Sequence, residues 1–82
     1  MTELQDIIKP GNTVRIFYGQ EHKKTELLHI RAIVDDGMVV VRVWSQRNRN
    51  WRYRVEDIGY FEMVHDDGRL KLEKKGDVSD AS

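Results

Sequence analysis

The side chains best suited to chemistry lie together in the middle of the chain, at residues 42–54. This segment contains five arginines, two tryptophans and one tyrosine, and no acidic residue. A guanidinium group matches the geometry of a phosphate, and an aromatic ring offers a flat surface on which a nucleobase can stack. Arginines interleaved with aromatic residues are therefore typical of a nucleic-acid-binding surface. The candidate binding residues are Arg42, Trp44, Arg47, Arg49, Arg52 and Arg54, joined by Arg15 and Phe17 from an earlier segment.

The segments that must position these residues have the pattern of short β-strands. Runs rich in β-branched and aromatic residues occur at residues 13–19, 25–34, 38–44, 51–55, 59–65 and 69–73. Asp35-Asp36-Gly37 and Asp66-Asp67-Gly68 are hairpin signals, because Asp-Gly pairs readily adopt positive φ angles. Residues 56–58 are too few for a helix and are predicted to form a single 3₁₀ turn. The pattern predicts an all-β fold, a small SH3-like barrel of five or six antiparallel strands.

The chain has room for one domain, because 82 residues cannot supply two stable cores. Residues 1–12 are predicted to form an N-terminal arm or a short helix, since Leu4, Ile7 and Ile8 have helical spacing. Residues 13–74 would form the barrel. Residues 75–82 have little to bury, and we expect them to be a disordered acidic tail.

The formal net charge of zero conceals a segregation of charge along the chain. Residues 15–54 contain nine basic and four acidic side chains, whereas residues 55–82 contain four basic and eight acidic ones. A basic centre attracts polyanions, and an acidic end limits non-specific binding. The longest apolar run, residues 38–41, is too short to cross a membrane, and the first residues do not have the pattern of a secretory signal. We therefore expect a cytoplasmic protein.

Strand alternation predicts which side chains are buried and which face solvent. Val39, Val41 and Val43 fall on one face of their strand, and Trp51, Tyr53 and Val55 fall on one face of the next. Pairing these two apolar sets predicts a core face. The remaining side chains would then gather on the outer face, which is the predicted binding surface: Arg42, Trp44, Arg52 and Arg54, with Arg15 and Phe17 beside them.

Residues 53–58, Tyr-Arg-Val-Glu-Asp-Ile, resemble the segment that ends a WYL domain. Residues 16–18, 29–34 and 37–44 are similar to the earlier strands of that family, so the resemblance covers residues 14–64. Met38-Val39-Val40 stands in place of the family's Trp-Tyr-Leu triplet, and the helix-turn-helix found in most WYL regulators is lacking. The chain thus resembles a divergent, stand-alone form. Residues 10–16 are equally similar to the Gly-x-x-Val start of KOW and Tudor domains.

The resemblance implies a fold and a class of function. All these families share an SH3-like barrel. WYL domains occur mostly in bacterial and phage transcription regulators and defence proteins, and they are thought to sense ligands that include nucleic acids. The resemblance therefore implies a regulatory role, with Arg54 at the position of the family's arginine.

Catalysis and metal binding are not expected. The chain has no cysteine, and its three histidines, His22, His29 and His65, lack the spacing of a metal site. No phosphate-binding loop or hydrolase motif is present. The paired aspartates precede glycines at predicted turns, which explains them without catalysis. We therefore predict a protein that is not an enzyme and has no cofactor.

The sequence favours a regulatory module that binds nucleic acid, with RNA or single-stranded DNA preferred over duplex because no helix is predicted that could enter a major groove. The alternative is a protein-interaction module of phage or mobile-element type, which would dock on a host protein through the same Arg and Trp residues. The arginines could also form an ordinary solvated face, paired across strands with Glu26 or Glu56. A homodimer formed through an edge strand stays open.

Overall fold

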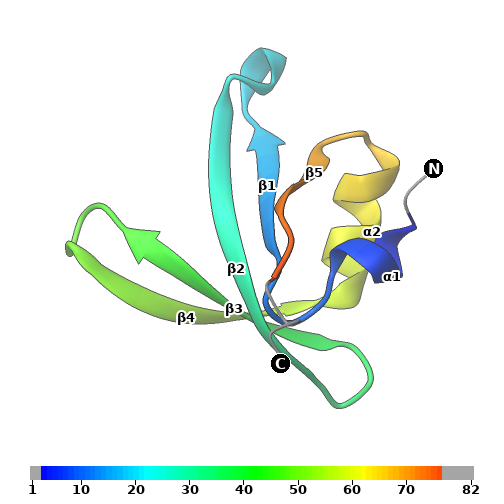
Figure 1. The fold of residues 1–82 in the computed structure, drawn as a ribbon. Coiled ribbons are helices and arrows are strands. Elements are labelled where there is room, and N and C mark those ends of the chain that lie inside the picture. Colours follow the sequence, from blue (N-terminus) through cyan, green and yellow to red (C-terminus); the bar gives the residue numbers. More distant parts are fainter. Residues whose placement is uncertain (1–2, 77–82) are drawn as a thin grey trace.

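The computed structural model describes residues 3–76. The chain begins with helix α1 (Leu4–Ile7) and continues through β1 (Thr13–Tyr18), a 3₁₀ turn (Gln20–His22) and the long strand β2 (Lys24–Val34). Strands β3 (Met38–Ser45) and β4 (Asn50–Asp57) follow, and helix α2 (Ile58–Asp66) connects β4 to the last strand, β5 (Leu70–Lys74). Figure 1 shows both helices on one side of the sheet.

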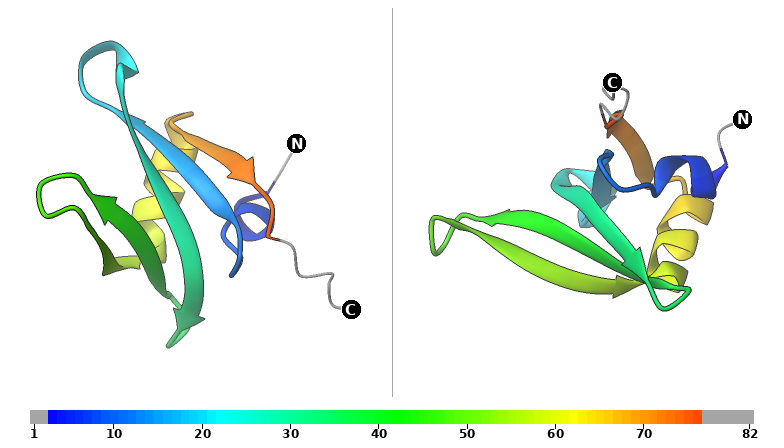
Figure 2. Two further views of the ribbon diagram at one scale, coloured as in Figure 1. Left: turned by 60° about the vertical axis from the view of Figure 1, so that its left-hand side comes forward. Right: turned by 60° about the horizontal axis from the view of Figure 1, so that its bottom comes forward.

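The five strands form one antiparallel sheet in the order β4-β3-β2-β1-β5. This confirms the prediction of an all-β fold built on five antiparallel strands. Strand β2 is strongly curved and its register with β3 shifts between Ile30 and Ala32, so that β1 and β3 diverge along it. The hairpin of β3 and β4 consequently projects away from the helices (Figures 1 and 2).

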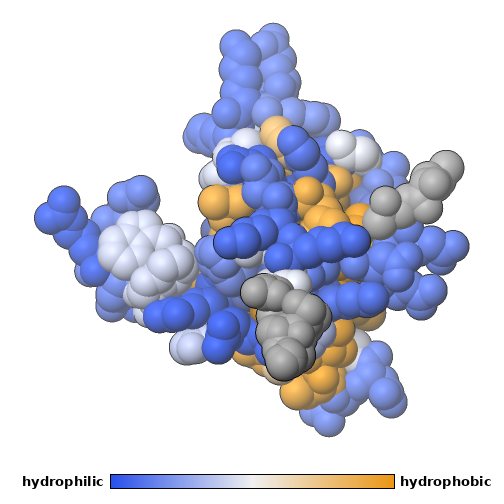
Figure 3. Space-filling model, viewed as in Figure 1, coloured by the Kyte–Doolittle hydropathy of each residue, from blue (hydrophilic) through white to orange (hydrophobic). Residues whose placement is uncertain are grey.

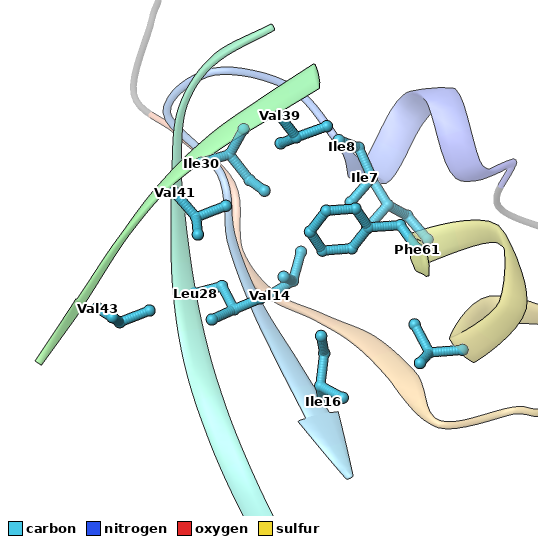
Figure 4. Close-up of a cluster of buried hydrophobic side chains, with 11 residues drawn as sticks. Ile7, Ile8, Val14, Ile16, Leu28, Ile30, Val39, Val41, Val43 and Phe61 are labelled. Carbon is cyan, nitrogen blue, oxygen red and sulfur yellow. The ribbon is translucent and has the colours of Figure 1, made fainter. Parts of the chain in front are cut away.

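The core lies between one face of the sheet and the two helices (Figure 4). Phe61 of α2 is fully buried against this face. The other buried apolar side chains are Ile7, Ile8, Val14, Ile16, Leu28, Ile30, Val39, Val41, Val43 and Val64. Buried and less buried residues alternate through Val14 and Ile16 of β1 and through Val39, Val41 and Val43 of β3, as expected of a sheet covered on one side.

Helix α2 replaces the strand predicted at residues 59–65, so that prediction is wrong. The side chain of Asp57 accepts a hydrogen bond of 2.8 Å from the backbone nitrogen of Gly59, which caps the helix start. Phe61 and Val64, three residues apart, then lie on its buried face. Gly68, with φ of 74°, follows the helix end, so Asp66-Asp67-Gly68 terminates a helix and is not a hairpin turn.

The other predicted hairpin turn is present between β2 and β3. Its positive φ angles belong to Asp35 (49°) and Asp36 (57°). Aspartate tolerates this region better than most non-glycine residues. The turn is therefore formed by the two acids, whereas Gly37 has no positive φ.

Both ends of the described chain are joined at Asn12, which is buried. Its side-chain nitrogen donates to the carbonyl oxygen of Ile7 at 3.0 Å, and its side-chain oxygen accepts from the backbone nitrogen of Gly76 at 2.8 Å. The N-terminal segment thus contains the short helix α1 and packs against the core. Of the predicted tail, Gly76 is bonded to Asn12, and residues 77–82 lie outside the described residues.

Candidate functional site

The pairing of β3 with β4 decides which side chains share a face. Trp44 lies opposite Trp51, and Arg42 lies opposite Tyr53. Directly opposed residues of an antiparallel pair project to the same side. Trp51 and Tyr53 therefore share the face of Trp44, and they are exposed by 43% and 62%. Val55 is exposed on this face as well.

The prediction that Trp51, Tyr53 and Val55 form the core together with the three valines is wrong. Val39, Val41 and Val43 lie opposite three charged residues of β4: Glu56, Arg54 and Arg52. No residue of β4 is buried, because this edge strand lies beyond the reach of the helices that cover the core. Arg52 and Arg54 consequently lie on the opposite face from Arg42 and Trp44, and the predicted grouping of these four residues is also wrong.

The length of the loop between β3 and β4 indicates which residues of the two strands share a face, and the prediction did not use it. The connection between β3 and β4 has four residues, 46–49, and Arg49 has a positive φ of 55°. A hairpin loop with an even number of residues pairs even-numbered with odd-numbered positions across its strands. Trp44 must then share a face with Trp51 and not with Arg52.

The exposed face of this hairpin contains a compact group of rings. Trp44 and Trp51 meet edge to face with ring centroids 5.3 Å apart, and His29 of β2 meets Trp51 in the same way at 5.4 Å. The guanidinium carbon of Arg42 lies 4.5 Å from the centre of the Trp51 ring and 5.9 Å from that of Tyr53. We call these five residues (His29, Arg42, Trp44, Trp51 and Tyr53) the aromatic face. Figure 3 shows pale side chains of intermediate hydropathy grouped over this hairpin, with hydrophilic ones around them.

Arg42 is positioned by the rings. Its Nε is buried and makes no hydrogen bond within residues 3–76. Cation–π attraction to Trp51 and Tyr53 is thus the interaction that orders its side chain. A pre-positioned guanidinium loses little conformational entropy when it meets an anion.

His29 links the aromatic face to β1. Its Nδ1 lies 3.0 Å from the hydroxyl oxygen of Thr13, its opposite neighbour on β1. Burial lowers the pKa of His29, and the positive charges of Arg42 and Arg31 lower the pKa further. The imidazole is therefore neutral at pH 7, and it packs beside Arg42 without charge repulsion.

A hollow of about 410 Å³ lies beside Trp44 and Trp51. Most of its other lining residues are polar or charged: Arg15, Tyr18, Thr25, Glu26, Leu27, His29 and Gln46. Volumes of about 300–1,000 Å³ are typical of small-molecule pockets. The hollow is thus large enough for a small flat group next to the rings.

Two of the predicted nucleic-acid-binding arginines are already paired with acids. The guanidinium of Arg15 donates to Glu73 at 3.0 Å and to the hydroxyl of Thr25 at 2.9 Å. Arg54 donates to both carboxylate oxygens of Glu26 at 3.1 Å each, and its Nε lies 3.1 Å from Glu56. Burial opposes the charge of Arg54, but the hydrogen bonds to Glu26 and the two negative charges outweigh burial and raise the pKa of Arg54. Arg54 thus pairs across strands with Glu26, as expected from the hypothesis that the arginines form an ordinary solvated face.

The remaining arginines keep their charge free for a ligand. Arg47, Arg49 and Arg52 are exposed, and none has a carboxylate within ion-pairing distance in residues 3–76. Arg47 and Arg49 lie in the loop at the tip of the hairpin, next to the aromatic face. Phe17 is half-buried on the same side of the sheet as His29.

No protein-family model, curated protein or solved structure matches this chain. The resemblance to WYL domains therefore stays a prediction from the sequence, and a function must be inferred from the site itself. Between residues 3 and 76, no helix is long and apolar enough to cross a membrane. The same residues contain no group of three acidic or histidine side chains that could hold a metal ion.

Proposed function

We propose that the protein binds single-stranded nucleic acid, RNA or DNA, on the aromatic face of its β3–β4 hairpin. The observation that carries this proposal is the exposure of Trp44, Trp51 and Tyr53 around the ordered guanidinium of Arg42. Water-exposed tryptophans are costly for a small protein to maintain and commonly mark a binding surface. Rings and guanidinium groups together are the components with which proteins stack bases and neutralise phosphates.

The geometry favours single strands over a duplex. Helix α1 has four residues, and α2 contains two acidic residues and no lysine or arginine, so neither helix suits the major groove of a duplex. A sheet face with exposed rings instead suits bases that are already unstacked. Stacking on such rings tolerates any base, so we expect weak sequence preference.

The described contacts separate the roles of the residues. Trp44 and Tyr53 are the exposed stacking surfaces, with Trp51 between them and Arg42 in place for a phosphate or a base carbonyl. Arg47 and Arg49 at the loop follow the phosphate backbone. We assign no phosphate contact to Arg15 and Arg54, because Glu73, Glu26 and Glu56 already pair with their guanidinium groups.

A protein ligand is the second candidate. Tryptophan, tyrosine and arginine are the residues most enriched at the energetic centres of protein interfaces, and all three are exposed here. Under this alternative the protein is an interaction module of phage or mobile-element type that docks on a host protein. The resemblance to WYL domains supports a regulatory role for either kind of ligand.

Salt dependence separates the two candidates. We expect a fluorescently labelled oligouridine or oligothymidine to bind, with log affinity falling against log salt by about 0.7 per neutralised phosphate. The double variant Arg47→Ala/Arg49→Ala should reduce that slope by about 1.4. Arg54→Ala is the matched control and should leave the slope unchanged. Absence of binding at low salt would exclude the nucleic-acid proposal and favour the protein ligand.

A further inference from the structure

Strand β4 is an open edge of the sheet. All eight of its residues pair with β3 in an unbroken register, and within residues 3–76 no strand pairs with its other side. Natural edge strands are usually guarded by prolines, bulges, lysines or short length. β4 contains no proline and no lysine, and its register with β3 shows no bulge. Its backbone groups are therefore available to another strand.

The charges on β4 do not guard this edge, because they are self-complementary. Arg54 is neutralised within its own chain by Glu26 and Glu56. Arg52 and Glu56 have opposite charges and stand two positions on either side of Arg54. If two copies of β4 pair antiparallel with Arg54 at the centre, Arg52 of each copy faces Glu56 of the other.

On the opposite face of β4, two exposed apolar side chains, Tyr53 and Val55, can cover each other across the same pairing. Tyr53 is 62% exposed and Val55 is 55% exposed, the highest values among the exposed large hydrophobic side chains of residues 3–76. In the same register, Tyr53 of each copy lies directly opposite Val55 of the other. Aromatic residues paired across strands with β-branched ones stabilise sheets, so both exposed groups gain cover.

We propose that the chain forms a homodimer in which β4 pairs with β4 of a second copy, centred on Arg54. The pairing forms two Arg52–Glu56 ion pairs on one face and two Tyr53–Val55 contacts on the other. A register centred on Tyr53 would place Arg52 against Arg54, and one centred on Val55 would place Tyr53 against Asp57. The register centred on Val55 would also pair Arg54 with Glu56, but only the register centred on Arg54 forms both the Arg52–Glu56 pairs and the Tyr53–Val55 contacts. In that register the two Arg54 side chains lie opposite each other, and each is neutralised by Glu26 and Glu56 of its own chain.

The dimer has a consequence for the aromatic face. A two-fold axis perpendicular to the sheet keeps the same faces of both copies on the same side. The ten strands then form one continuous sheet with the two aromatic faces side by side. Tyr53 belongs both to the aromatic face and to the dimer contact. The backbone pairing of β4 and the Arg52–Glu56 ion pairs need no ligand, so the dimer stands whether or not the aromatic face binds nucleic acid.

Charge reversal tests the pairing. In sedimentation equilibrium over a concentration series, the wild-type chain should have the mass of two chains and fall to that of one on dilution. Arg52→Glu and Glu56→Arg should each abolish the dimer, since like charges then face each other. The double variant Arg52→Glu/Glu56→Arg should restore it. Wild-type protein with the mass of one chain at every concentration, or single reversals that still dimerise, would overturn the proposal.

Disulfide trapping tests the register independently of charge. The chain has no cysteine of its own, so any disulfide must come from the introduced residues. A mixture of the Tyr53→Cys and Val55→Cys proteins should form a mixed disulfide in preference to either homodisulfide. The matched control mixes Trp51→Cys with Val55→Cys, and its mixed disulfide should form much less. Equal trapping in both mixtures would contradict the register.

Discussion

Arg54 of β4 reaches across β3 to Glu26 of β2 and binds both oxygens of its carboxylate at 3.1 Å each. This pair joins the projecting hairpin to the start of the long strand. Both side chains are more than one-third exposed, so solvent screens the attraction. The arginine that the sequence offered as a ligand contact thus links two strands of the sheet.

Arg54→Ala should lower stability without affecting nucleic-acid affinity. We expect a loss of about 1 kcal/mol in the free energy of unfolding. This value is at the upper end of the range for exposed ion pairs, because the contact is bidentate. The measurement is urea denaturation followed by circular dichroism at low protein concentration. Arg47→Ala, in the exposed loop, is the control and should change stability by less than about 0.5 kcal/mol. Equal losses for both variants would show that the Glu26 contact does not stabilise the fold.

Trp51→Ala should leave the protein folded, because the ring is 43% exposed and packs only on the solvent face. The loss of its edge-to-face contacts costs about 1 kcal/mol. Phe61→Ala, by contrast, removes a fully buried ring and should cost about 3–5 kcal/mol, enough to unfold so small a domain. Thermal denaturation of the two variants distinguishes them. An unfolded Trp51→Ala protein together with a stable Phe61→Ala protein would reverse the assignment of faces.

The core positions of β3 could be predicted from the sequence, whereas the face that β4 presents could not. Alternation in β3 correctly placed Val39, Val41 and Val43 in the core, because local periodicity depends only on neighbouring residues. The relation of β4 to β3 depends on the loop, and a preference for joining apolar faces led to the wrong pairing. Trp51 and Tyr53 are exposed on the aromatic face and do not belong to the core.

Helix α2 was missed for a related reason. Residues 59–65 contain aromatic and β-branched types that suit a strand, while the evidence for a helix was the cap at Asp57 and the three-residue spacing of Phe61 and Val64. Tertiary packing decided between them. A helix buries both Phe61 and Val64 against the core. A strand would direct these two side chains to opposite faces and could bury only one of them.

The pH dependence of stability should contain a contribution from His29. Burial and neighbouring arginines lower its pKa in the folded state below the ordinary value of 6.5. The neutral form is therefore favoured by folding, and this contribution is present above pH 6.5 and lost as the pH falls through the folded-state pKa. The His29→Gln protein should lack this loss. Parallel pH profiles of stability for the two proteins, measured by thermal denaturation, would contradict the assignment.

Asn12 should stabilise the fold, because its side chain joins the N-terminal segment at Ile7 to the C-terminal segment at Gly76. Asn12→Ala leaves the carbonyl of Ile7 and the backbone nitrogen of Gly76 without their partner, at a cost of about 1–3 kcal/mol. Asn12→Asp keeps the acceptor for Gly76 but loses the donor to Ile7. Amide hydrogen exchange should rise at Gly76 in Asn12→Ala and stay low there in Asn12→Asp. Unchanged exchange in both variants would show that Asn12 does not hold this segment.

Tryptophan fluorescence tests the proposed function most directly, because both tryptophans of the chain lie on the aromatic face. Trp44→Phe and Trp51→Phe each leave one indole, which reports on its own position. Titration with an oligouridine, monitored in parallel through a label on the RNA, should quench both single-tryptophan proteins with the same midpoint as the label. RNA that binds without changing the fluorescence of either tryptophan would contradict stacking on the aromatic face and place the site elsewhere.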